Sequence, residues 1–167
     1  LATALKEILS EEGIKAFIFH MDDYFHLPPT SNHNQRLEDI NFVGPQEVNL
    51  GLLQKHIDLV ISGQENTLEK PLVHYKENEI RSETIGFDEI SVIIIEGTYT
   101  MLLDVDFKVF IDRDFKETFQ NRMERGRDEM SPFVENVLEI EHAILQKDKI
   151  NADLFVDKEY NVAANLR

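Results

Sequence analysis

The chain has 167 residues, of which 42% are apolar, carries a net charge of −15 at pH 7 and contains no cysteine. This length fits one domain with a proper core, and the lack of cysteine excludes disulfides and thiolate metal sites. Its negative charge repels nucleic acid and anionic lipid, so neither nucleic acid nor a membrane is expected as a partner. With no membrane-spanning apolar run and no signal peptide, we expect a cytoplasmic protein.

The first part of the chain predicts a helix, a strand and a long loop. Residues 1–8 keep helical spacing of apolar side chains, and residues 14–19 form an apolar run typical of a strand. A helix that precedes a strand usually follows one, so we expect a further strand and its loop before residue 1. Residues 26–45 are polar and contain Pro28 and Pro29. We expect them to form a long loop or flap over the site. Loops of this length tend to be functional.

The remaining elements predict an α/β fold. A helix is expected from Pro45 to a stop at Gly63, and residues 68–85 favour a hairpin at a sheet edge. Apolar or periodic segments then predict strands at 92–95, 107–111 and 154–156, and helices at 115–123 and 133–144. Because strands alternate with helices, the sheet should be mostly parallel, with right-handed crossovers, in a three-layer nucleotide-binding arrangement.

Acidic residues follow two of the predicted strands. Asp22 and Asp23 come shortly after the strand at 14–19, and Glu96 directly follows the strand at 92–95. Ligands of open α/β folds bind beyond the carboxyl ends of the strands, so we expect these carboxylates to lie at one rim. Such an arrangement suits a site for a metal ion and a nucleotide.

Positive charge is concentrated in one short segment of this acidic chain. Gly126 breaks the helical pattern there and places Arg125 and Arg127 on a turn. This concentration could attract the phosphates that the rest of the chain repels. The cluster comprises Arg113, Lys116, Arg122, Arg125 and Arg127.

Six segments in this order resemble the uridine kinase and phosphoribulokinase family of P-loop kinases. They are FIFHMDDYFHLP, NFVGPQEVNLGLL, VIIIEGTY, VFIDRD, ERGRD and NADLFV. The resemblance implies a single P-loop NTPase domain over residues 1–167 with a lid around 113–130. It also implies ATP and Mg²⁺ as cofactors and a small-molecule acceptor with a hydroxyl group. In that family a strand and the loop G-x-x-x-x-G-K-[ST] precede a helix such as the one expected at 1–8.

The resemblance also implies roles for individual residues. Asp22 matches the catalytic aspartate, which accepts the proton of the attacking hydroxyl and lies near the magnesium ion. Glu96 takes the Walker B position and would hold the metal through water, while Gly97 lets the backbone pass close to the nucleotide. The lid arginines, which would bind phosphate oxygens and neutralise charge during transfer, correspond to Arg122, Arg125 and Arg127.

The acceptor region departs from the uridine kinase pattern. Val43 stands where the family has an aspartate that binds ribose hydroxyls, and Val73 stands where it has an aromatic residue that meets the base. A family histidine aligns near Asn78. These differences leave the acceptor open, because a site built on hydrogen bonds discriminates against substrates that lack the partner groups. Candidate acceptor-binding residues are Asp23, Tyr24, Phe42, His74, Tyr75 and Arg81.

Three alternatives remain at this level. The chain could be a non-catalytic nucleotide-binding or regulatory domain of the same fold. The run HMDDYF is also similar to nicotinamide riboside kinases. A receiver domain would use Asp112 as phospho-acceptor, although the arginine-rich turn and the long flap do not fit it. A homo-oligomer is compatible with all of these.

Overall fold

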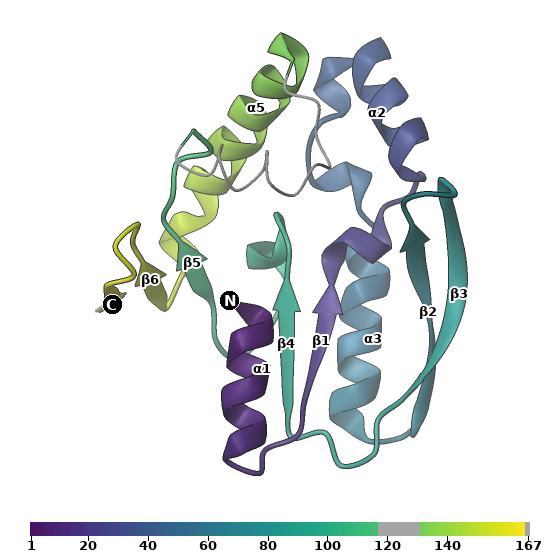
Figure 1. Cartoon of the computed structure of the whole chain (residues 1–167), viewed down its shortest axis with the longest axis vertical. Coiled ribbons are helices and arrows are strands. Elements are labelled where there is room, and N and C mark those ends of the chain that lie inside the picture. The colour runs from purple at the N-terminus through teal and green to yellow at the C-terminus, as the bar shows by residue number, and fades with distance from the viewer. Residues whose placement is uncertain (117–130, 166–167) are drawn as a thin grey trace.

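Two parallel strands form the centre of the molecule. The computed structural model describes residues 1–116 and 131–165. Strand β1 (Ala16–His20) pairs with β4 (Val92–Glu96) in a register that places Ala16 beside Val92 and His20 beside Glu96. Both strands therefore end at the same edge, where Figure 1 shows α2 and α5 above the arrowheads. This confirms the predicted parallel pairing.

Helices α1 (Ala2–Glu11) and α3 (Leu50–Ser62) pack against this pair. The Asn49 side chain caps α3 by accepting a hydrogen bond from the Leu52 amide at 3.0 Å. Gly63, with φ of 62°, ends the helix in the left-handed conformation that favours glycine. Leu53 of α3 is fully buried in a core shared with Phe19 of β1.

Strands β2 (Thr67–His74) and β3 (Glu79–Gly86) form the predicted antiparallel hairpin beside α3 (Figure 1). Its turn reaches the start of α2, where the Thr30 amide donates to Asn78 Oδ1 at 2.7 Å. The hairpin turn is therefore hydrogen-bonded to α2, the helix that follows β1 and η1.

A second small sheet lies beside α5. Strands β5 (Val109–Ile111) and β6 (Leu154–Val156) are parallel, and β7 (Val162–Ala164), which the sequence did not predict, is antiparallel to β6. Helix α5 (Pro132–Asp148) begins after Ser131, whose hydroxyl accepts from the Val134 amide at 3.2 Å. The described part of the chain is thus α/β, as predicted. Short 3₁₀ helices complete it: η1 (Met21–Tyr24), η2 (Ile40–Phe42), η3 (Pro45–Glu47), η4 (Thr100–Leu102) and η5 (Lys149–Asn151).

Two sequence expectations were wrong. The expected loop at 26–45 contains helix α2 (Pro29–Glu38). Pro29 stands at the first position of this helix, where proline is well tolerated because an N–H there would have no partner within the helix. The helix expected from Pro45 begins instead at Leu50. The helix expected at 115–123 falls mostly outside the described residues. Within residues 1–116 and 131–165, no helix has the length and apolarity needed to cross a bilayer.

The Tyr24–His56 contact predicts a pH dependence of stability. The Tyr24 hydroxyl and His56 Nδ1 hydrogen-bond at 2.9 Å in the interior. Burial, together with the charges of Lys55 and Lys70, lowers the pKa of the His56 imidazole. The unfolded chain then binds this proton more tightly, so the free energy of unfolding should fall as pH drops below about 6.5.

Urea unfolding at pH 7.5 and 5.5 measures this effect. We expect His56→Gln to lose less stability between the two pH values than the parent protein loses, because glutamine does not titrate. His26→Gln serves as the control, since His26 is exposed. Equal losses in the parent and in His56→Gln would contradict the assignment.

Candidate functional site

The structure brings Asp22 and Glu96 to the same edge of the β1–β4 pair. Glu96 is the last residue of β4 and pairs with His20, the last residue of β1. Asp22 lies two residues after His20, in η1. Neighbouring strands are about 4.8 Å apart, so the two acids share one rim. Both residues are exposed. Carboxylate oxygens at such a rim fit Mg²⁺, which contacts one or two carboxylates and keeps several waters.

His20 contacts the Glu96 carboxylate directly. The distance from His20 Nδ1 to Glu96 Oε1 is 2.5 Å, and about half of each side chain is exposed. This contact restrains the orientation of Glu96. Among the described residues, no group of three or more His, Asp or Glu side chains could hold a metal ion. A magnesium ion at this rim would therefore depend on water for most of its ligands.

Gly97 is required by packing. Its φ is 150°, and a Cβ added there would lie 2.4 Å from Met21 Cβ. Glycine therefore allows the segment after β4 to pass close to the segment after β1. The close approach keeps the two carboxylate-bearing segments together, independently of any role for Gly97 in nucleotide binding.

Asp23 is held in the interior by an ion pair. Its Oδ2 accepts from Lys70 Nζ at 2.9 Å, and its Oδ1 accepts from the Val73 amide at 3.0 Å. Lys70 is 4% exposed and also pairs with Glu83 at 2.7 Å. The Asp23 carboxylate therefore attaches the hairpin to η1, and we exclude it from the candidate acceptor site.

Tyr24 is also directed into the core. Its side chain is fully buried, with the hydroxyl bonded to His56, and burial raises the pKa of the phenol above its ordinary value. A side chain in this position cannot touch an acceptor without the core opening. We therefore correct the expectation that Tyr24 binds substrate.

The other predicted site residues are spread over several elements. Phe42 is half-buried in η2, His74 ends β2, and Tyr75 is exposed in the hairpin turn. Arg81 pairs with Glu79 at 2.7 Å and lines a hollow of about 330 Å³ between α3 and the hairpin. Neither Asp22 nor Glu96 lines that hollow. The predicted lid residues Arg122, Arg125 and Arg127 lie outside the described residues.

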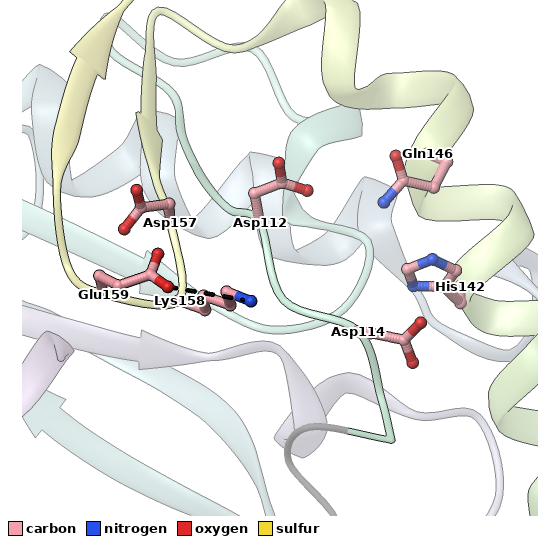
Figure 2. A pocket seen from close by; sticks show the side chains of 7 residues that line it. All are labelled: Asp112, Asp114, His142, Gln146, Asp157, Lys158 and Glu159. Atoms are coloured by element: carbon pink, nitrogen blue, oxygen red, sulfur yellow. Dashed lines mark ion pairs between the residues drawn. The ribbon is translucent and has the colours of Figure 1, made fainter.

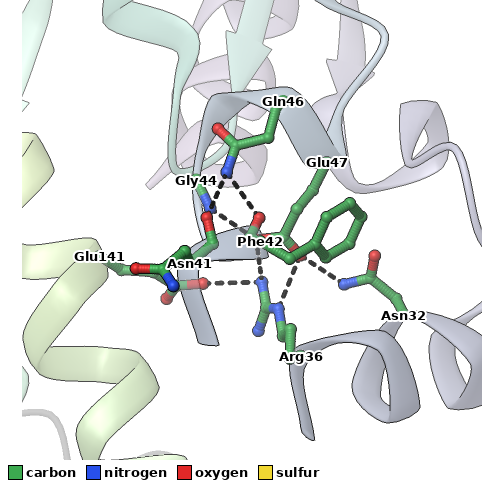
Figure 3. Close-up of polar contacts among 8 residues, drawn as sticks. All are labelled: Asn32, Arg36, Asn41, Phe42, Gly44, Gln46, Glu47 and Glu141. Atoms are coloured by element: carbon green, nitrogen blue, oxygen red, sulfur yellow. Dashed lines mark hydrogen bonds and ion pairs between the residues drawn. The ribbon is translucent and has the colours of Figure 1, made fainter. Parts of the chain in front are cut away.

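Sequence reasoning missed a buried charged cluster centred on Glu47 (Figure 3). The Glu47 side chain is 0% exposed. Its carboxylate accepts hydrogen bonds from Arg36 Nε at 2.6 Å, from the side-chain amide nitrogen of Asn32 and from the backbone amide of Gly44 at 2.7 Å. Arg36 also reaches Glu141 of α5 at 3.0 Å. Burial lowers the pKa of Arg36, but the pairs with Glu47 and Glu141 outweigh it, and the net shift is upward.

A sequence signal for Glu47 did exist. The segment Gly44-Pro45-Gln46-Glu47 has proline at the first position of a turn and glutamate at the third, and the Glu47 side chain caps the Gly44 amide. This pattern predicts a glutamate folded back onto its own backbone. It does not predict that Arg36 and Asn32 share the same carboxylate.

A larger hollow, of about 470 Å³, lies at the carboxyl ends of β5 and β6 beside α5 (Figure 2). Asp112 is held there by Lys149 Nζ at 2.6 Å. Four carboxylates in one hollow repel phosphate, so a triphosphate is disfavoured there. The lining residues are Asp112, Asp114, His142, Gln146, Asp157, Lys158 and Glu159.

The Asp23–Lys70 ion pair predicts a large loss of stability on mutation. Lys70→Met should leave Asp23 as an uncompensated buried charge and lower the free energy of unfolding by about 3–5 kcal/mol. Lys15→Met is the matched control, because Lys15 pairs with Glu89 on the surface and its loss should cost far less stability. Urea denaturation of both variants measures the difference, and similar costs would show that the interior pair has no special role.

Comparisons with known proteins bear on the family of this chain. The model of the Phosphoribulokinase / Uridine kinase family matches residues 1–163. A bifunctional alpha-galactosidase/sucrose kinase of Mediterraneibacter gnavus is 28% identical over 97% of this chain, which spans only 19% of that protein. A uridine kinase of Halobacterium salinarum is 25% identical over 98% of this chain and 78% of its own length.

Solved structures show the same fold. Phosphoribulokinase from Rhodobacter spheroides superimposes with a TM-score of 0.66 at 11% identity, covering 93% of this chain and 64% of that one. At this identity the likeness concerns the fold alone, which is that of the P-loop kinases. With the family match over nearly all residues, this chain belongs to the phosphoribulokinase and uridine kinase family.

Proposed function

We propose that the protein of which this chain is part or whole is an ATP-dependent kinase that phosphorylates a hydroxyl group of a small metabolite. The observation that carries the proposal is the position of Asp22 and Glu96 at one rim of the parallel pair. Family membership supports it. It also disfavours the receiver-domain alternative with Asp112 as phospho-acceptor.

In this proposal Asp22 is the general base. It accepts the proton of the acceptor hydroxyl as the acceptor oxygen bonds to the γ-phosphorus and the bond to the β–γ bridging oxygen breaks, releasing ADP. Glu96, oriented by His20, would hold Mg²⁺ through water, and the bound ion would neutralise phosphate charge. Arg122, Arg125 and Arg127 would bind the phosphates from the lid.

The acceptor is proposed to be a sugar hydroxyl, either of a nucleoside or of a saccharide. Uridine and sucrose, after which the two relatives' kinase activities are named, both present such hydroxyls. Val43 and Val73, which stand at the expected ribose and base contacts, are 4% and 8% exposed. Buried aliphatic side chains can supply neither the hydrogen bonds to ribose nor the aromatic contact with the base, so a uridine pocket of the usual kind is disfavoured. Nicotinamide riboside belongs in the same test panel.

Replacement of the proposed base gives the most direct functional test. Asp22→Asn in the full-length protein should lower kcat by about 10²–10⁴-fold, because asparagine cannot take the proton. The affinity for ATP should change little. ADP release with Mg²⁺-ATP and a panel of nucleosides and sugars measures turnover, and calorimetry measures nucleotide binding.

The control is Asp88→Asn, since Asp88 is an exposed loop residue. Full turnover by Asp22→Asn would show that another group is the base. Nucleotide binding by the parent protein without turnover of any acceptor would favour the non-catalytic alternative.

A further inference from the structure

Strand β3 is a free edge in the part of the chain that the structure describes. The β2–β3 hairpin is a two-stranded sheet, and its strand β2 contacts η1. In Figure 1, β3 lies on the outer side of this hairpin. It spans 8 residues, which is longer than the usual strand of about 5–6. A long edge strand presents N–H and C=O groups on which a further strand can pair.

Two residues of β2 show which backbone groups of β3 face this edge. The Val73 amide donates to Asp23 Oδ1 at 3.0 Å, so its pair with Ile80 is not a hydrogen-bonded one. Pro71 has no N–H, which fits the same kind of pair with Ser82. Because the two kinds of pair alternate, every second residue of β3 directs its N–H and C=O away from β2. These residues are Ile80, Ser82 and Thr84.

The outward side of β3 is open to a partner. Within residues 1–116 and 131–165, the outward N–H and C=O groups of β3 have no other backbone partner. Ser82 and Thr84 are exposed, and Ile80 is half-buried. The edge is therefore accessible to solvent and to a second strand.

Charges of both signs lie along β3. Arg81 stands between Glu79 and Glu83, and the three side chains share one face of the strand because side chains alternate. Their side chains are 54%, 53% and 34% exposed, respectively. Among the described residues, Arg81 binds Glu79 through Nε and Nη2, and Glu83 binds Lys70 through Oε1. Nη1 of Arg81 and Oε2 of Glu83 are left for a further partner.

A second copy of β3 can satisfy these groups in one register. A two-fold axis perpendicular to the sheet places the same residue of both copies at the centre of an antiparallel pair. With Arg81 or Glu83 at the centre, that residue lies opposite its own copy, and like charges directly opposite each other are destabilising. With Ser82 at the centre, Arg81 of each copy lies opposite Glu83 of the other. The outward backbone groups then pair Ser82 with Ser82 and Ile80 with Thr84.

We propose that β3 pairs with β3 of a second copy of this chain, antiparallel and centred on Ser82, so that the two hairpins form one continuous sheet. This inference does not rest on the proposed kinase function. The net charge of −15 makes two copies repel each other, but physiological salt screens this repulsion beyond about 8 Å. One strand pair is smaller than the standard interface of about 1,600 Å², so the dimer should depend on concentration.

Ser82→Cys in the full-length protein tests the register. This chain has no cysteine, and any cysteine outside residues 1–167 would be replaced by serine. Opposite residues of a hydrogen-bonded pair have Cα atoms about 5.5 Å apart, which suits a disulfide. Oxidised glutathione should therefore convert Ser82→Cys to a covalent dimer. Thr84→Cys is the matched control, because this exposed edge residue would lie about 13 Å along the strand from its own copy.

Sedimentation equilibrium in about 0.15 M salt measures the association itself. The parent protein should show a monomer–dimer equilibrium. Arg81→Glu should raise the Kd of the dimer about tenfold, because it places a glutamate opposite Glu83 of the second copy. Lys6→Glu makes the same change of charge at an exposed position of α1, away from the hairpin (Figure 1), and should leave the Kd unchanged.

Ser82→Pro tests the backbone pairing without a change of charge. Proline has no N–H to donate across the central pair, so the dimer should be lost. The hairpin should keep its own ladder, because this N–H points away from β2. An unchanged melting temperature would confirm that the variant is folded.

Three results would overturn the proposal. The parent protein could remain monomeric at the highest concentration that sedimentation reaches. A dimer could form that both Arg81→Glu and Ser82→Pro leave intact, which would place the interface elsewhere. Thr84→Cys could also cross-link as fast as Ser82→Cys, which would exclude a pairing centred on Ser82.

Discussion

The parallel pairing of β1 with β4 is the constraint on which the candidate site depends. Its register places Glu96 beside His20, and the turn that follows brings Asp22 to the same rim. A shift of one residue would turn every side chain of the strand to the other face of the sheet. Glycine is needed at position 97 for this arrangement, because a side chain there would collide with Met21. The position of the two acids is thus set by backbone pairing rather than by flexible side chains.

Buried charges hold the surrounding elements in place. Lys70 joins the hairpin to Asp23 in η1, and Glu47 joins η3 to Arg36 in α2. Buried ion pairs contribute little net stability, since the cost of removing charges from water offsets their attraction. Their value here is geometric, because each fixes a segment that borders the rim. The Arg36–Glu141 pair extends this network to α5.

Local patterns were sufficient for the two central strands, although not for β7, and contacts distant in sequence explain most of the errors. Apolar runs predicted β1 and β4 and the rim that they share. Helix α2 was missed because its sequence is mostly polar, with no apolar periodicity, and because Pro28 and Pro29 were interpreted as loop residues. Asp23 looked like a site residue because the sequence does not show that Lys70, 47 positions away, would be buried against it. Glu47 was missed for the same reason, since its arginine partner comes from another element.

The anomalous scattering of Mn²⁺, substituted for Mg²⁺, would test the central claim most directly. Crystals of the full-length protein with Mn²⁺ and a non-hydrolysable ATP analogue would locate the metal. The account predicts a peak at the rim, about 4 Å from Glu96 if a water lies between, and close to Asp22. A peak in the acidic hollow lined by Asp112 and Asp157, with nothing at the rim, would contradict it.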